Sequence, residues 1–137
     1  MSDLCPSPLE PCALEGGLPL VSLQRPGPQV LAARLVIRGG SGADPPQERG
    51  AHQLLAGLMT RGCGDLDAEA LADQVEGAGA ALRAEAMEDA LTLTLHRAAE
   101  DAEKLLPLLL SMARQPTLDH DQLELERQLN LQTLQRQ

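Results

Sequence analysis

The sequence predicts an α+β domain, in which strands and amphipathic helices share one hydrophobic core. Three observations support this fold class. The length of 137 residues is that of one domain. A stretch near the middle alternates apolar and polar residues, which is typical of half-buried strands. Several longer stretches place apolar residues at helical spacing.

The first third of the chain is predicted to hold a leader and two strands. Residues 1–13 are rich in proline and are predicted to be a flexible leader. Leu18–Leu23 is a short strand candidate, and Arg25–Pro28 is predicted to be a turn. Val30–Arg38 contains three β-branched residues and is predicted to be a buried strand. Glycine and proline then predict a loop over Gly39–Pro46.

Two helices are predicted to follow this loop. Between Gln47 and Thr60, apolar residues recur at helical spacing and form one stripe. They are Ala51, Leu54, Leu55, Leu58 and Met59. The second helix is predicted to begin after a cap at Asp65 or Asp67 and to end near Glu76, where glycines follow.

A β-hairpin is predicted next. Ala80–Met87 and Ala90–His96 both alternate in polarity, and Glu88-Asp89 between them supplies the turn. The second strand alternates strictly, with leucines on one face and Thr92, Thr94 and His96 on the other. We expect this strand to place one face on the core and the other toward solvent or a cleft.

The last part of the chain is predicted to form two more helices. The first spans Ala98–Ala113 and contains Pro107, and the second begins after a cap at Asp119. Neither glycine nor proline stops the final helix before the sequence ends. Residues 14–137 are therefore predicted to be part of a larger domain.

Composition and charge argue against several classes of partner. The chain has no Phe, Tyr or Trp, and its net charge is −9. Phosphate backbones and anionic lipids repel such a protein, so neither nucleic acid nor a membrane is expected as a partner. The N-terminal residues lack the features of a signal peptide. The three cysteines, an odd number, are predicted to be free thiols, and a cytoplasmic location is predicted.

Five short motifs, taken in order, resemble the insulinase/pitrilysin family. These inverted-zincin metallopeptidases include the mitochondrial processing peptidase. The motifs are Leu14-Glu15-Gly16-Gly17-Leu18, Leu35-Val36-Ile37-Arg38-Gly39-Gly40-Ser41, Gly50-Ala51-His52, Gly79-Ala80 and Pro116-Thr117-Leu118. The resemblance implies an antiparallel sheet flanked by helices. It also implies that residues 14–137 are the first part of one N-terminal peptidase domain.

The resemblance further implies that the zinc chemistry of the family is missing. A helical His-x-x-Glu-His motif supplies two zinc ligands and the general base, and a distant Glu is the third ligand. His52 falls on the first ligand, Leu55 on the general base, Ala56 on the second ligand and Thr133 on the third. Leucine accepts no proton, and catalytic zinc needs three protein ligands. We expect no catalytic residue and no bound cofactor, with His52 as a remnant of the site.

The resemblance implies a role as well. The edge strand that pairs with peptides in this family carries an Asn-Ala pair, which falls on Arg83-Ala84. The expected function is that of a pseudoenzyme, a non-catalytic subunit or domain. It would pair with an active insulinase-like peptidase subunit or second domain and bind unfolded peptide.

Two alternatives remain open. The chain could be an active zinc-dependent metalloendopeptidase with an unrecognised site, or a non-enzymatic α+β interaction module. The other histidines give the first alternative no support, because the spacing of His96 and His120 relative to His52 does not indicate a metal site. The sequence indicates neither the substrate nor the identity of the partner.

Overall fold

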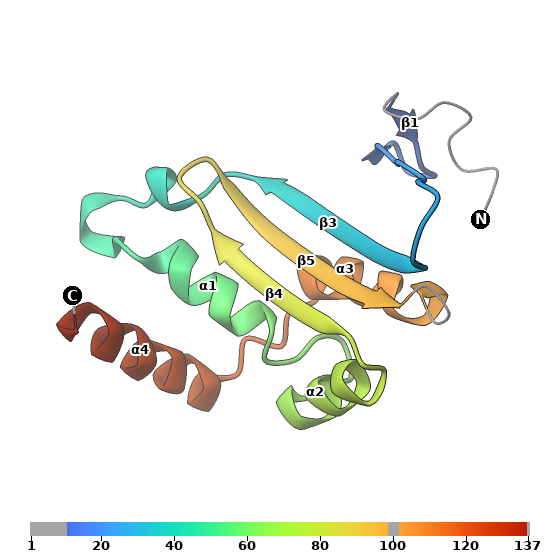
Figure 1. The fold of residues 1–137 in the computed structure, drawn as a ribbon. Coiled ribbons are helices and arrows are strands. Elements are labelled where there is room, and N and C mark those ends of the chain that lie inside the picture. The colour runs from blue at the N-terminus through green and yellow to red at the C-terminus, as the bar shows by residue number, and fades with distance from the viewer. Residues whose placement is uncertain (1–10, 99–101, 137) are drawn as a thin grey trace.

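A computed structural model describes residues 11–98 and 102–136, which form a three-stranded antiparallel sheet and four α-helices (Figure 1). The predicted α+β fold class is confirmed. The predicted leader falls mainly on residues 1–10, which lie outside the described residues.

The sheet consists of β3 (Val30–Arg38), β5 (Ala90–Ala98) and β4 (Ala81–Ala86), with β5 in the centre. The predicted strand over Val30–Arg38 and the predicted hairpin are confirmed. The hairpin closes where the Met87 N–H donates to the Ala90 carbonyl at 2.7 Å. Within the described residues, β3 and β4 each have one neighbouring strand, so both are edge strands.

A separate two-stranded pair lies near the N-terminal end of the described chain. It joins β1 (Cys12–Ala13) to β2 (Pro19–Leu20). The predicted strand over Leu18–Leu23 is therefore too long. Val21 and Leu23 are 57% and 47% exposed, and because no packed face covers them they have no reason to stay in a sheet.

The two described cysteines differ in state. Cys12 is disulfide-bonded, so the expectation of three free thiols is wrong for this residue. Cys63 is free and only 2% exposed. Burial raises the pKa of the Cys63 thiol, which lowers the fraction present as reactive thiolate.

The four helices are α1 (Ala51–Met59), α2 (Ala68–Gly77), α3 (Ala102–Arg114) and α4 (His120–Gln135). The Asp67 carboxylate caps α2 by accepting the Ala70 N–H at 2.8 Å. No helix in the described part of the chain is both long and apolar enough to cross a bilayer.

Two helix starts differ from the sequence prediction. The predicted helix from Gln47 begins at Ala51. A 3₁₀ turn over Pro46–Glu48 comes first, and Gly50 then has a left-handed backbone with φ of 96°, which no α-helix continues through. The helix predicted from Ala98 begins at Ala102, since Ala98 still pairs with Val30 in the sheet.

All helices that contact the sheet cover the same face. β3, β4 and β5 turn their apolar side chains toward that face, where they meet buried residues of the helices. The strand residues involved are Ala33, Leu35, Ile37, Leu82, Ala84, Ala86, Leu91, Leu93 and Leu95. Thr92 and Thr94 point to the other face, yet they are only 4% and 7% exposed, because β5 lies between two strands.

A charged contact joins α4 to α1. Glu126 is the buried residue of α4, and its Oε1 accepts hydrogen bonds from Arg61 Nε and Nη2 at 2.9 and 2.7 Å. Gly57 makes room for this carboxylate, because a Cβ there would lie 2.6 Å from the Glu126 carboxyl carbon. The leucines of α4 are 37–66% exposed instead: Leu123, Leu125, Leu129, Leu131 and Leu134.

Gly57→Ala should destabilise the fold by about 1–3 kcal/mol, because the added methyl group forces the Glu126 carboxylate away from α1. Urea unfolding followed by circular dichroism measures the change. Gly77→Ala in α2 is the matched control, since open space surrounds its Cβ position. It should stabilise the fold by about 0.4–1 kcal/mol. Equal effects of the two substitutions would contradict the role of the close approach at Gly57.

Candidate functional site

The three motif positions on α1 lie along the side of the helix that faces the sheet. Ala56 is 0% exposed and belongs to the core, and Leu55 packs against that core. The His52 side chain is 28% exposed. His52 and Leu55 line a cavity of about 230 Å³ together with apolar residues such as Ile37 and Leu91. Ala56 thus lies in the packed interior, whereas His52 and Leu55 border a small cavity.

One nitrogen of His52 is held by an aspartate. His52 Nδ1 lies 2.5 Å from Asp44 Oδ1, and the Gly50 N–H donates to Asp44 Oδ2 at 2.9 Å. The Asp44 side chain is 3% exposed. The hydrogen bond from His52 lowers the pKa of Asp44 below its ordinary value of 3.8. Burial raises this pKa, and the hydrogen bond from the Gly50 N–H lowers it further. This carboxylate anchors the start of α1.

Sequence reasoning missed Asp44. Its one signal is that it is the only acidic residue in the loop predicted over Gly39–Pro46. Nothing in the local pattern indicates that the loop folds back onto the beginning of α1.

The side chains at the four motif positions do not fit a three-ligand zinc site. Leu55 and Ala56 carry no atom that binds a metal, so of the three positions on α1 only His52, through Nε2, could ligate one. Thr133 is exposed, and its hydroxyl donates to the Leu129 carbonyl at 2.9 Å. Across residues 11–98 and 102–136, no group of three His, Cys, Asp or Glu side chains is placed to hold a metal ion.

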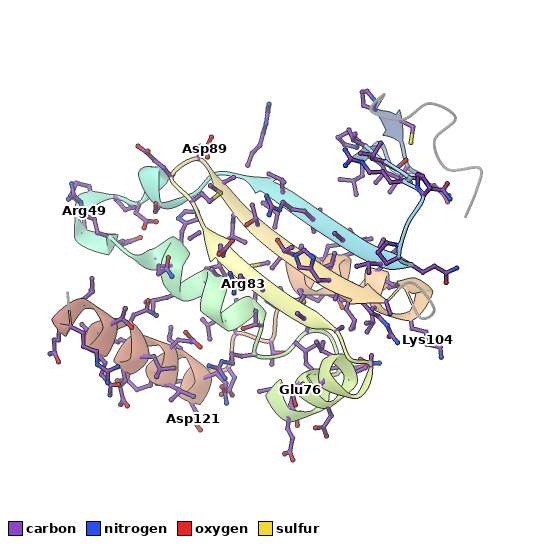
Figure 2. The ribbon with its side chains drawn as sticks, in the orientation of Figure 1. Arg49, Glu76, Arg83, Asp89, Lys104 and Asp121 are labelled. Atoms are coloured by element: carbon purple, nitrogen blue, oxygen red, sulfur yellow. The ribbon has the colours of Figure 1, made fainter. Side chains whose placement is uncertain are left out.

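The structure places Arg83 and Ala84 on the edge strand β4. Figure 2 labels Arg83 on this strand. Ala84 packs against the core, and the Arg83 side chain, 75% exposed, lies on the face without helices. Hydrogen-bonded and non-hydrogen-bonded pairs alternate along an antiparallel ladder. Since Met87 bonds to Ala90, the backbone N–H and C=O of Ala84 point toward the free edge.

A cavity of about 580 Å³ lies along this part of β4. Its lining combines polar side chains of the open sheet face with apolar side chains of β4 and α2. Among them are Arg34, Arg83, Thr94, His96, Leu82 and Val75. The candidate peptide-binding strand therefore borders a cavity that is large enough for several side chains of a ligand.

Asp44→Asn should lower the melting temperature at neutral pH, because an amide oxygen accepts hydrogen bonds less strongly than a carboxylate. The pKa of Asp44 is lower in the folded state, so its contribution to stability is present above about pH 3.8. It is lost as the pH falls through the folded-state pKa. Thermal melts between pH 2 and 7 should show the difference from the unsubstituted chain shrinking at the acid end.

The control for this substitution is Glu48→Gln, which changes an exposed carboxylate near the same loop. It should leave the melting temperature nearly unchanged. If Asp44→Asn lowered the melting temperature as much at pH 2 as at pH 7, the stabilising role of the Asp44 carboxylate would be contradicted.

Comparisons with known proteins agree with this fold. The chain is similar to the inactive domain of a peptidase M16 from Pseudomonas fluorescens, with a TM-score of 0.72 and 22% identity over 82% of this chain and 27% of that chain. It is also similar to a protease from Helicobacter pylori, with a TM-score of 0.74 and 21% identity over 88% of this chain and 29% of that chain. The chain thus spans less than a third of either solved structure.

No curated protein matches the chain. The family model of insulinase, peptidase family M16, matches residues 20–137. This match includes every element from β3 to α4. The chain therefore belongs to the insulinase family, peptidase family M16.

Proposed function

We propose that the protein is a non-catalytic member of the insulinase family that binds an extended peptide and pairs with a catalytically active subunit or domain. The observation that carries the proposal is the core position of Ala56, at the second ligand position, beside Leu55 at the general-base position. The cytoplasmic location and the absence of a cofactor, both expected from the sequence, remain part of this proposal.

The packing of α1 supports the loss of catalysis. A zinc ligand and a general base must reach a water-filled site, whereas Ala56 has no exposed surface and Leu55 adds to the core. The similarity to a structure described as an inactive domain of a peptidase M16 is consistent with this proposal.

The position of β4 supports peptide binding. The backbone groups of Leu82, Ala84 and Ala86 point toward the free edge by the alternation of the ladder. An extended peptide can add to such an edge as a further strand through main-chain hydrogen bonds. In a pair with an active peptidase subunit or domain, this chain would bind the peptide and the active partner would cleave it.

The chain alone should show no chelator-sensitive peptide cleavage. Its rate of peptide hydrolysis should lie at least about 10²-fold below that of an active family member from the same source. The same chain should co-purify with that active member and change its rate of peptide hydrolysis. Zinc analysis and peptidase assays with and without a chelator measure the first point, and co-expression measures the second.

Two results would contradict this proposal. Chelator-sensitive cleavage that is lost in His52→Ala would establish an active zinc peptidase. Capture only of proteins unrelated to peptidases, with no effect on the active family member, would favour the interaction module.

Strand addition can be tested on the peptide, without changing the protein. The test uses two labelled peptides of the same sequence. One carries N-methyl groups at its odd positions, and the other carries them at its even positions. A peptide that pairs with β4 uses alternate N–H groups, so one methylated peptide should lose binding and the other should keep it. Fluorescence anisotropy measures both affinities. Equal binding of the two peptides would exclude strand pairing.

A further inference from the structure

We propose that the open face of the sheet carries a carboxylate-binding site, formed by Arg34, Thr94 and Arg83, which takes an acidic side chain of the bound peptide. The inference rests on the proposed peptide-binding function and names the class of peptide. It extends that function from the backbone of the ligand to its side chains.

The register of the sheet places the three residues in one row across the strands. Arg34 of β3 pairs with Thr94 of β5, and Thr94 pairs with Arg83 of β4. All three side chains lie on the face without helices, because the core face takes Leu35, Leu93 and Ala84 at the next positions. The short threonine thus lies between two long guanidinium side chains.

The spacing of the row suits one carboxylate. Cα atoms of opposite residues lie roughly 4.5–5.5 Å apart, so Arg34 and Arg83 are separated by about 10 Å at the backbone. Both arginine side chains are long and exposed, and Thr94 lies between them in the row. Arginine donates in a planar fork that matches a carboxylate, and the threonine hydroxyl can donate a further hydrogen bond.

The positive charges of this row are weakly neutralised by the described residues. Arg34 makes no ion pair with any residue in the described ranges. Arg83 lies 3.6 Å from Glu85 Oε1, and the two side chains are 75% and 51% exposed. Such an exposed pair is weak. A ligand carboxylate can therefore compete with Glu85 for Arg83.

The size and lining of the cavity favour a peptide over a small anion. Its volume of about 580 Å³ exceeds that of an inorganic anion several times. The lining continues from Arg34 and His96 on the open face to Leu82 of β4 and Val75 of α2. A peptide strand on β4 would direct alternate side chains toward this face.

The test compares two labelled extended peptides that differ only in having Glu or Gln at alternate positions. Fluorescence anisotropy with the full chain should show about five- to tenfold tighter binding of the Glu peptide. Arg34→Gln and Arg83→Gln should each remove most of this preference. Glu85→Gln should increase it, because the competing carboxylate is gone. Circular dichroism checks that each variant is folded.

Arg38→Gln is the matched control, because Arg38 lies on the same strand and face but outside this cavity. This variant should keep the preference for the Glu peptide, and a loss equal to that of Arg34→Gln would overturn the site.

Equal affinity of the unsubstituted chain for both peptides would overturn the carboxylate site and leave the proposed peptide binding intact. Binding of neither peptide would overturn both. Displacement by inorganic phosphate, beyond that by sodium chloride at equal ionic strength, would indicate a general anion site instead.

Discussion

The two-residue alternation of the strands is the constraint on which this structure depends. Because Leu93 must face the helices, its neighbour Thr94 must face the opposite side, and the same holds for β3 and β4. A shift of register by one residue would bring Arg34 and Arg83 into the core. The alternation therefore sets the position of the helices and of the polar open face together.

The α1 helix shows how its residues Leu55 and Ala56 are packed against the sheet. In a chain without Phe, Tyr or Trp, the core is assembled mainly from leucine, together with Ala56, Val75, Cys63 and two methionines. Ala56 allows α1 to lie close to the sheet, and Leu55 fills space beside the strand residues. His52 keeps a polar partner in Asp44, whose carboxylate also accepts the Gly50 N–H. The histidine thereby contributes to the start of the helix.

Elements defined by regular patterns could be predicted from the sequence, and contacts between distant segments could not. Val30–Arg38 and the hairpin carry a period of two, and Asp67 carries a capping signal, so these were predictable. The start of α1 was misjudged because the left-handed backbone of Gly50 is a property of the folded loop. For the candidate site, positions on α1 and β4 follow from the motif, whereas the contact with Asp44 depends on a loop folding back.

The leucine pattern of α4 also misleads when read alone, because its buried residue is Glu126. This polar attachment has a consequence for the energetics of local opening. Separating α4 from α1 would break the Arg61–Glu126 pair, in which the Glu126 side chain is only 11% exposed. Charge screening weakens such a pair but leaves the apolar contacts of the sheet intact. Salt concentration should therefore act more on the attachment of α4 to α1 than on the packing of β3, β4 and β5.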